Sequence, residues 1–321
     1  MSQQALLPWM REQYEWQVAQ IVKQKYSHAN LYTGARASGA EEFATAISRF
    51  LLCLAPLDGY PCGECKSCTL LQKDGHPDLH ILKTEEGSAA IKIDAVRGVL
   101  HSISQTSQFG GAKVVLIFGP EEMNENSANA LLKGLEEPSD NTFFILVSCE
   151  PSRLLATIRS RCISLSIAKP NRQQALDWLA QNGIKDAELM LTEAGGLPLV
   201  VAQWNQGQMF EQRQLILDSL KALATDNSAL TKCAKDLSAL DVKFVVEQLV
   251  GWVQNAVRVQ SGGVSFNEFD KHLAGVDLKT IFDFYDQLLR KRRMLNSGSN
   301  PNPQLLLEEL LLDLNLVLEA A

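Results

Sequence analysis

The sequence predicts an α/β protein with a parallel sheet, followed by an all-α region. Two observations support this prediction. Between residues 29 and 167, five short apolar runs alternate with segments of helical periodicity, as in a sheet whose parallel strands are joined by helices. From Arg172 to the end, the apolar residues follow helical spacing almost throughout. We therefore expect a sheet domain first and helical domains after it.

The five expected strands occupy residues 29–33, 78–82, 113–118, 142–147 and 162–167. The third and fourth contain the runs VVLIF and FFILV. Continuous apolar runs of this kind are typical of strands that are buried on both faces of a sheet. Because parallel sheets bind ligands at the carboxyl ends of their strands, a functional site is expected in the loops that follow.

The boundaries of the domains are indicated by breaks in these patterns. Pro170 and Asn171 end the sheet pattern, so we expect a sheet domain over residues 1–168, a small helical domain over 169–207 and a helical bundle over 208–321. The last helix should have Asn302 as its N-cap and Pro303 at its first position. Its nine leucines predict burial, either within its own bundle or against another subunit.

Length, charge and hydropathy exclude several classes of protein. A chain of 321 residues is long enough for two or three domains. The net charge of −7 provides no overall positive field, which argues against an autonomous DNA-binding protein. No run of eighteen apolar residues occurs, and the first ten residues lack the pattern of a signal peptide. We therefore expect a cytoplasmic protein.

Four of the seven cysteines lie within sixteen residues, at Cys53, Cys62, Cys65 and Cys68. Four thiolates are enough to complete the tetrahedral shell of a structural zinc ion. The two-residue gaps are also found in iron–sulfur proteins, although the fourth cysteine lies upstream here and no Cys-Pro follows. A redox pair of Cys62 and Cys65 is a further alternative. We expect zinc.

Two nearby histidines, His76 and His80, are reserve ligands for the same ion. Four cysteines would leave them no vacant position.

The segment Gly34-Ala35-Arg36-Ala37-Ser38-Gly39-Ala40-Glu41 follows the first expected strand and has the glycine spacing of a phosphate-binding loop. Ala40 replaces the lysine that would reach the terminal phosphates. Glu41 replaces the hydroxyl that would hold magnesium, and its carboxylate would repel phosphate. A plain strand-to-helix turn would give the same pair of glycines, Gly34 and Gly39.

The third expected strand should end in carboxylates if this chain hydrolysed ATP. It ends instead in Phe118 and Gly119. Glu121 and Glu122 follow several residues beyond the position where a metal would be held, and we expect them to form the solvated start of a helix. Hydrolysis of ATP by this chain is therefore not expected.

Two longer strings are more specific. Residues 129–138 read NALLKGLEEP and residues 154–162 read LLATIRSRC. Together they closely resemble the clamp-loader branch of the AAA+ ATPases. In that family the arginine of the Ser-Arg-Cys motif, here Arg161, projects into the ATP site of a neighbouring subunit. A second family arginine, the sensor on the helical domain, is replaced here by Pro198.

The four cysteines, the opening Pro8-Trp9 and the degenerate phosphate loop make the chain similar to the δ′ family of bacterial DNA polymerase III. This resemblance implies a P-loop AAA+ sheet domain with a zinc module at residues 53–68, a helical lid and a helical collar. It also implies a subunit that does not hydrolyse ATP but belongs to the holoenzyme of a DNA-directed DNA polymerase, a nucleotidyltransferase.

The resemblance further implies the cofactors and partners. Zinc would be structural, and Arg161 would be an arginine finger that acts in trans. The implied partners are the γ or τ motor subunits, the δ subunit and, indirectly, the sliding clamp and primer-template DNA, with no membrane.

Alternative functions are an active ATPase with an atypical phosphate loop and a zinc-dependent nucleic-acid-binding module. Arg161 could also pair with a carboxylate of its own chain. We expect the basic run at residues 290–293 to be a solvated helix face.

Overall fold

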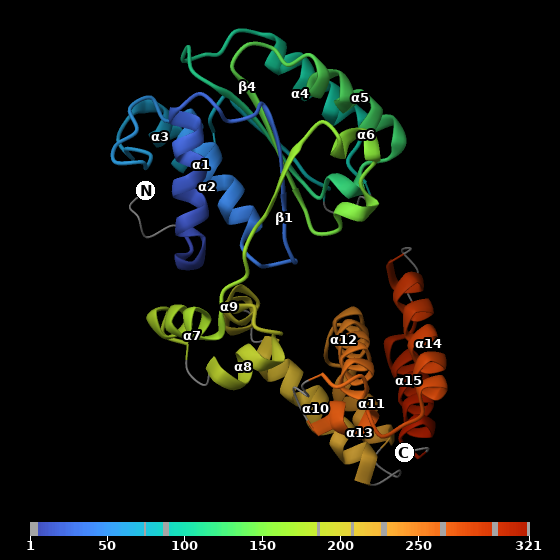
Figure 1. Cartoon of the computed structure of the whole chain (residues 1–321). Helices are drawn as coiled ribbons and strands as arrows, with labels where there is room; N and C mark the ends of the chain where they lie inside the picture. The colour runs from blue at the N-terminus through green and yellow to red at the C-terminus, as the bar shows by residue number, and fades with distance from the viewer. Residues whose placement is uncertain are drawn as a thin grey trace. The chain divides into compact units, whose positions relative to one another are not determined.

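The computed structural model describes residues 6–73, 75–85, 90–184, 187–206, 209–225, 230–263, 268–296 and 301–319. Figure 1 shows the whole chain. Two compact units are present, one formed by residues 1–185 and 196–200 and the other by residues 186–195 and 201–321. The division into three domains stays a prediction. In the described part of the chain, no helix is both long enough and apolar enough to cross a membrane.

The first unit is built on a five-stranded parallel sheet in the order β2-β3-β4-β1-β5. The strands are β1 (Ala29–Thr33), β2 (Leu79–Leu82), β3 (Lys113–Phe118), β4 (Thr142–Ser148) and β5 (Ile163–Ser166). All five predicted strands are confirmed, each to within one residue at either end. The predicted fold class is confirmed as well.

Helices cover both faces of this sheet, as Figure 1 shows. Along β3, Val114 and Leu116 join one apolar cluster, whereas Val115 and Ile117 join another on the opposite face. The first cluster includes residues of α1 (Arg11–Val22), α2 (Ala40–Leu52) and α3 (Lys66–Gln72). The second includes residues of α4 (Ile93–Ser104), α5 (Glu125–Glu136) and α6 (Ala156–Arg159). The continuous apolar run of β3 therefore reflects burial on both faces.

Shorter helices complete the first unit. They are the 3-10 helices η2 (Pro8–Met10), η3 (Pro120–Glu122) and η4 (Pro151–Arg153), together with the α-helix α7 (Arg172–Gln181). Helix α7 begins with a capping box, in which Asn171 and Gln174 each accept a hydrogen bond from the other's backbone N–H group. Pro170 and Asn171 thus end the sheet region and start a helix, as predicted.

The second unit is helical. Its helices are α8 (Ala187–Glu193), α10 (Met209–Thr225), α11 (Leu230–Leu237), α12 (Val242–Gln260), α13 (Glu268–Leu273), α14 (Leu278–Asn296) and α15 (Pro303–Leu318). Helix α9 (Pro198–Gln206) contributes residues to both units. Helices α10 to α15 enclose one apolar core, to which α12, α14 and α15 contribute many residues.

Helix α15 begins as predicted. The Asn302 side chain accepts hydrogen bonds from the backbone N–H groups of Gln304 and Leu305, and Pro303 is the first helical residue. Six of the nine leucines are buried within the unit, and the remaining three are exposed. The exposed leucines are Leu305, Leu312 and Leu316. Burial in its own bundle is therefore confirmed for most of these leucines, while three of them remain exposed to solvent.

A buried ion pair attaches α8 to this bundle. Arg213 of α10 lies 3.4 Å from Glu193 of α8, and both side chains are almost fully buried. The guanidinium carbon lies 4.2 Å from the ring centre of Trp204 and 5.3 Å from that of Trp252. Burial lowers the pKa of Arg213 and raises that of Glu193. The charged pair and the indole rings explain why α8 groups with the bundle and not with α7.

Close packing of α5 depends on Gly134. A Cβ atom at this position would lie 2.6 Å from Leu100 Cδ2 and 2.9 Å from Phe144 Cζ, both of which are shorter than any ordinary contact. A residue with no side chain therefore allows α5 to approach α4 and β4 this closely.

We predict that Gly134→Ala destabilises the protein by about 1–3 kcal/mol, because the added methyl group overpacks a filled interface. The midpoint of urea unfolding measures the change. Gly98→Ala is the matched control, since Gly98 lies at an exposed position of helix α4 with nothing within 4 Å of its Cβ position. The control should stabilise the protein by up to about 1 kcal/mol, through helix propensity alone. Equal effects of the two substitutions would contradict the packing argument.

Candidate functional site

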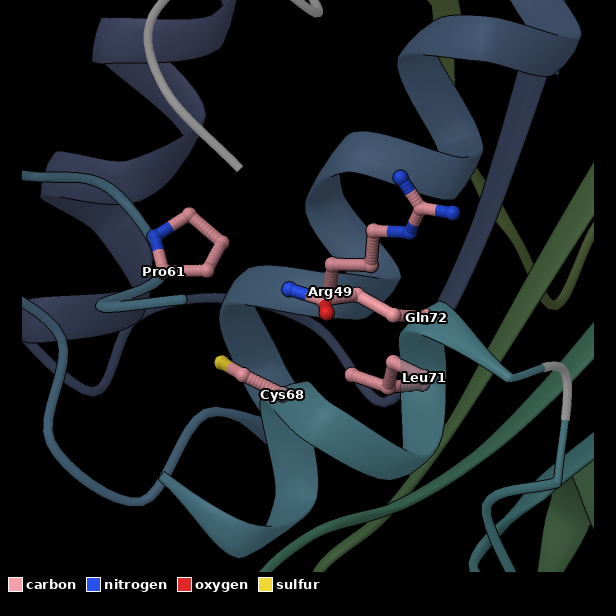
Figure 2. A pocket seen from close by; sticks show the side chains of 5 residues that line it. All are labelled: Arg49, Pro61, Cys68, Leu71 and Gln72. Atoms are coloured by element: carbon pink, nitrogen blue, oxygen red, sulfur yellow. The ribbon is translucent and has the colours of Figure 1, made fainter. Parts of the chain in front are cut away.

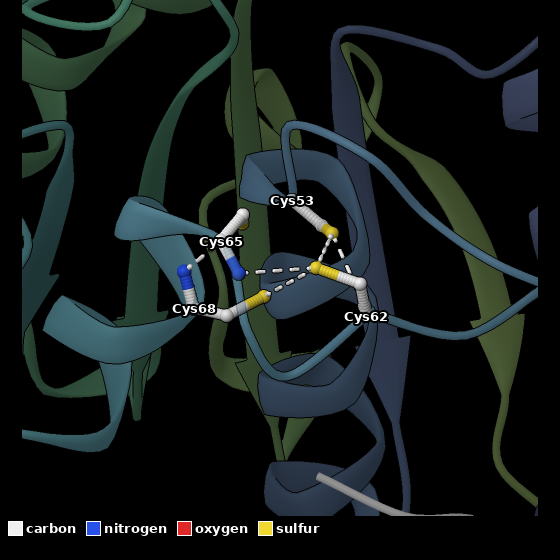
Figure 3. A group of neighbouring side chains, drawn as sticks. All are labelled: Cys53, Cys62, Cys65 and Cys68. Carbon is white, nitrogen blue, oxygen red and sulfur yellow. Dashed lines mark hydrogen bonds between the residues drawn. The ribbon is translucent and has the colours of Figure 1, made fainter.

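The four clustered cysteines converge on one point beside α2 and α3. Cys53 follows the end of α2, and Cys65 is the N-cap of α3. The sulfur of Cys62 lies 3.6 Å from that of Cys53 and 3.9 Å from that of Cys68. Figure 3 shows the four side chains together.

These distances fit a metal site. All four sulfur atoms lie within 4.8 Å of one another. In a tetrahedral shell with metal–sulfur bonds of about 2.3 Å, the sulfur atoms are separated by about 3.8 Å. The cluster could therefore hold one metal ion with all four positions occupied by protein.

Backbone groups of the same loop support the thiolates. The N–H groups of Cys62, Cys65 and Cys68 each point at the sulfur of the preceding cysteine, at 3.3, 3.3 and 3.4 Å respectively. The N–H of Cys65 lowers the pKa of Cys62. Burial opposes ionisation of Cys65, but N–H and thiol neighbours outweigh it and lower its pKa to about 6. Burial raises the pKa values of Cys53 and Cys68, so a metal would displace their protons.

His76 is not a ligand but a link between this loop and the sheet. Its Nε2 atom lies 2.8 Å from the Ser67 hydroxyl, which donates to the carbonyl of Leu52, so Nε2 is the protonated nitrogen. Its Nδ1 atom accepts the N–H of Asp78. Both ring nitrogens are thus engaged, and burial lowers the pKa of this histidine. Among the described residues, the thiol cluster includes neither His76 nor His80.

A small recess adjoins the cluster. It is lined by Arg49, Pro61, Cys68, Leu71 and Gln72, and its volume is about 10 Å³. Figure 2 shows these side chains, with the guanidinium of Arg49 directed away from the sulfur of Cys68. A space of this size holds at most one water molecule. The recess is therefore an extension of the metal centre and not a substrate pocket.

The phosphate-loop segment forms the turn from β1 into α2. Gly39 adopts a left-handed conformation with φ of +102°, and a Cβ atom there would lie 2.3 Å from Met10 Cε and 2.5 Å from Leu7 Cδ1. The indole of Trp9 donates to the carbonyl of Ser38 at 3.3 Å. The segment before α1 therefore packs directly on the loop.

Two polar side chains of this segment differ in burial, with Ser38 buried and Glu41 exposed. The Ser38 hydroxyl is buried and lies 2.6 Å from where a Cβ of Gly34 would be, so it fills the interior of the turn. Glu41 lies in the first turn of α2, and partial burial of its carboxyl group raises the pKa of that group. The loop keeps the glycines of a phosphate-binding loop, but its interior contains its own side chains.

The carboxylates beyond β3 are engaged in hydrogen bonds within the unit. Glu121 accepts the backbone N–H groups of Cys149 and Glu150, at 3.1 and 3.2 Å, where β4 ends. Glu122 accepts the hydroxyl of Thr84. The expected helix is present as the 3-10 helix η3, but its two carboxylates are bonded within the unit and are not simply solvated. Glu121 satisfies two N–H groups that the strand end leaves without a partner, and this long-range contact has no signature in local sequence.

Arg161 lies between α6 and β5 on a partly exposed surface. One terminal nitrogen donates to the Thr157 carbonyl at 2.8 Å, and the other forms an ion pair with Glu136, the last residue of α5. The pairing with a carboxylate of its own chain, which the sequence left open, is thus observed. The Arg161 side chain is 35% exposed, so it remains accessible from outside.

Three basic side chains of the run on α14 contact groups of the same helical unit. Lys291 lies 2.7 Å from Glu309 of α15, and Arg292 lies 3.7 Å from Glu247 of α12. Arg293 donates to the carbonyl of Leu289. The expected solvated helix face is therefore found only in part, because Arg290 and Arg293 are exposed whereas the Lys291 side chain is 11% exposed.

Two family models match this chain. The model described as DNA polymerase III, delta subunit, matches residues 10–171, and the model of its C-terminal region matches residues 207–315. A DNA polymerase III subunit δ′ from Pseudomonas aeruginosa is 34% identical over 318 residues, which cover 94% of this chain and 97% of that protein. The chain belongs to the δ′ family of DNA polymerase III clamp-loader subunits.

Other δ′ proteins match a shorter region. The Escherichia coli subunit is 36% identical over 216 residues, or 66% of this chain and 65% of that protein. The Haemophilus influenzae subunit is 37% identical over 217 residues, with the same shares covered. A γ subunit-related protein of Thermotoga maritima has 16% identity and a TM-score of 0.54, over 94% of this chain and 99% of that one. This last likeness supports the fold alone.

We predict that this δ′ chain holds one metal ion and that Cys65→Ser loses it. Removing a ligand should weaken binding by more than the roughly 10- to 100-fold that removal of a supporting group costs. Elemental analysis after dialysis measures the metal content. Retention should also decline as pH falls, because protons compete with the metal for the four thiolates.

Cys149→Ser is the matched control, because Cys149 is a free thiol outside the cluster. It should retain the metal fully. Equal metal content in the two variants would rule out the site as described.

Proposed function

We propose that this chain is a clamp-loader subunit that does not hydrolyse ATP itself and that completes the ATP site of a neighbouring motor subunit with Arg161. The observation that carries this proposal is the separation between the phosphate loop and Arg161, which lie at opposite ends of neighbouring strands. The degenerate phosphate loop follows the carboxyl end of β1, whereas Arg161 precedes the amino end of β5.

These two positions lie at opposite edges of the sheet, because β1 and β5 are parallel neighbours with Asn30 paired to Ile163 and Thr33 to Ser166. A strand of five residues such as β1 is about 16 Å long. That length exceeds the reach of an arginine side chain, so Arg161 cannot serve the phosphate loop of its own chain. Apart from its pair with Glu136, the partly exposed guanidinium is accessible to a molecule outside this unit.

The chain's own nucleotide site lacks the groups that hydrolysis needs. Ala40 and Glu41 replace the lysine and the hydroxyl, and Phe118 and Gly119 replace the carboxylates. The nearby Glu121 is already bonded to the end of β4. Binding of magnesium and of the terminal phosphates therefore has no support from this chain.

A guanidinium suits the proposed role. It stays charged at any physiological pH, and its planar fork can donate to two phosphate oxygens together. Arginine fingers in phosphoryl transfer contribute about 10³- to 10⁵-fold in rate. The loader has several sites, of which one would borrow this arginine, so the effect on the whole complex should be smaller.

The proposed partners follow from family membership and from the exposed face of the second unit. They are the γ or τ motor subunits, the δ subunit and, indirectly, the sliding clamp and primer-template DNA.

Three leucines of α15 are more than half exposed. They are Leu305, Leu312 and Leu316. An apolar stripe of this kind is typical of a surface that another protein covers, and we propose that it contributes to the collar of the assembled loader.

The proposed metal is zinc, held in a structural role. Four thiolates with no open position match structural zinc sites, which lack a place for substrate. The His76 hydrogen bonds tie the module to β2 and leave that residue no capacity as a ligand. The elemental analysis described above distinguishes zinc from iron.

We predict that Arg161→Ala lowers the DNA-stimulated ATPase activity of a loader reconstituted with purified motor subunits, while assembly and metal content stay unchanged. Arg161→Lys should restore little, because an ammonium group cannot reproduce the fork. The isolated chain should show no turnover.

Arg159→Ala is the control, since Arg159 is an exposed arginine two residues away. It should leave the rate unchanged. A loader containing Arg161→Ala that hydrolyses ATP at the unmutated rate would falsify the finger role.

We also predict that the paired substitutions Leu312→Gln and Leu316→Gln reduce incorporation into the loader by at least about tenfold, because they remove apolar area from the proposed contact. Gel filtration of the reconstituted complex measures incorporation. Leu54→Gln, an exposed leucine of the first unit, is the control and should assemble normally. Normal assembly of the α15 variant would show that this face is not the contact.

A further inference from the structure

We propose that Glu136 restrains the arginine finger. In the unassembled chain its carboxylate holds the guanidinium of Arg161, and the phosphates of the neighbouring subunit must displace it. This inference rests on the finger role proposed above and adds a means of regulation to the same site.

The two side chains come from the ends of two helices, α5 and α6. Glu136 ends α5, and Arg161 follows α6. One terminal nitrogen of Arg161 pairs with the Glu136 carboxylate, and the other donates to the Thr157 carbonyl at 2.8 Å. The two side chains are 35% and 47% exposed, so solvent and ions reach the pair.

This pairing occupies the same groups that a finger would use. A finger acts through its positive charge and through N–H groups aimed at phosphate oxygens. The Glu136 carboxylate neutralises that charge and takes one of the two terminal nitrogens. The two acceptors therefore compete, and the paired state is inactive.

Stability of the fold does not account for the position of Glu136. A carboxylate in the last turn of a helix opposes the helix dipole. Leu135 of α5 and Ile158 of α6 already belong to one apolar cluster, together with Leu154, which precedes α6. The pair thus adds little to the packing of these helices, which favours a role that acts on Arg161.

The restraint must also be weak enough to release. Ion pairs between exposed side chains contribute little and are screened by salt. Removing such a restraint should therefore raise the rate at the affected site by no more than about fivefold. A partner phosphate with more than one negative charge can displace a single carboxylate.

The test compares Glu136→Gln with Glu137→Gln in the full chain, reconstituted with purified motor subunits and assayed for DNA-stimulated ATPase at low salt. Glu137 is the matched control, because it is an exposed glutamate next in sequence. We expect Glu136→Gln to raise the rate of the whole loader, by less than the gain of about fivefold at the one affected site, and Glu137→Gln to leave it unchanged. The gain should shrink as salt increases.

The same substitutions are then made in a chain that carries Arg161→Ala. There Glu136→Gln should have no effect, because a restraint needs a finger to act on, whereas a purely structural role would persist. An unchanged or lower rate for Glu136→Gln in the natural background overturns the restraint, and a lower rate would mean that Glu136 orients the finger for use. If Arg161→Ala alone changes nothing, the finger role itself fails, and the two failures are thereby distinguished.

Discussion

Burial of the parallel sheet on both faces is the constraint on which the rest of the first unit depends. Parallel strands need crossover connections, and the helices of those connections cover the two faces. Val114 and Leu116 of β3 pack on one side while Val115 and Ile117 pack on the other. Once the strands are fixed in this way, their ends lie at two defined edges. The loops that follow the strands therefore lie at one edge of the sheet, and the loops that precede them lie at the other. The phosphate-loop segment and Arg161 are separated in this way.

The loops at the two edges of the sheet carry different side chains. At the carboxyl edge, the turn after β1 contains the buried hydroxyl of Ser38, and Glu121 binds the end of β4. At the amino edge, Arg161 and Glu136 lie on a partly exposed surface. A family whose members combine subunits can separate the two halves of an ATP site in this manner. In the proposed function, the carboxyl edge has lost its capacity for hydrolysis, while the amino edge keeps the partly exposed Arg161.

Sequence reasoning predicted the backbone far better than the side-chain partners. Strand positions and the N-cap at Asn302 could be predicted because apolar runs and capping residues are local signals. The thiol cluster could be predicted because its ligands are close in sequence. The bonds of Glu121 to the end of β4 and the pairing of Arg161 with Glu136 span 25 residues or more in sequence. Only the packed sheet and helices bring these groups together, so no local pattern could reveal them.

The changes at the carboxyl edge reinforce one another. Leu7 and Met10 take up the space that a side chain on Gly39 would need. The Ser38 hydroxyl lies in the space beside Gly34. Glu41 places a carboxyl group in the first turn of α2. A lysine at position 40 would supply one charge but would not remove that carboxyl group, clear the turn or release Glu121. The proposed loss of hydrolysis would therefore rest on the packing around the turn as well as on single residues, and it would leave hydrolysis in the assembled loader to other subunits.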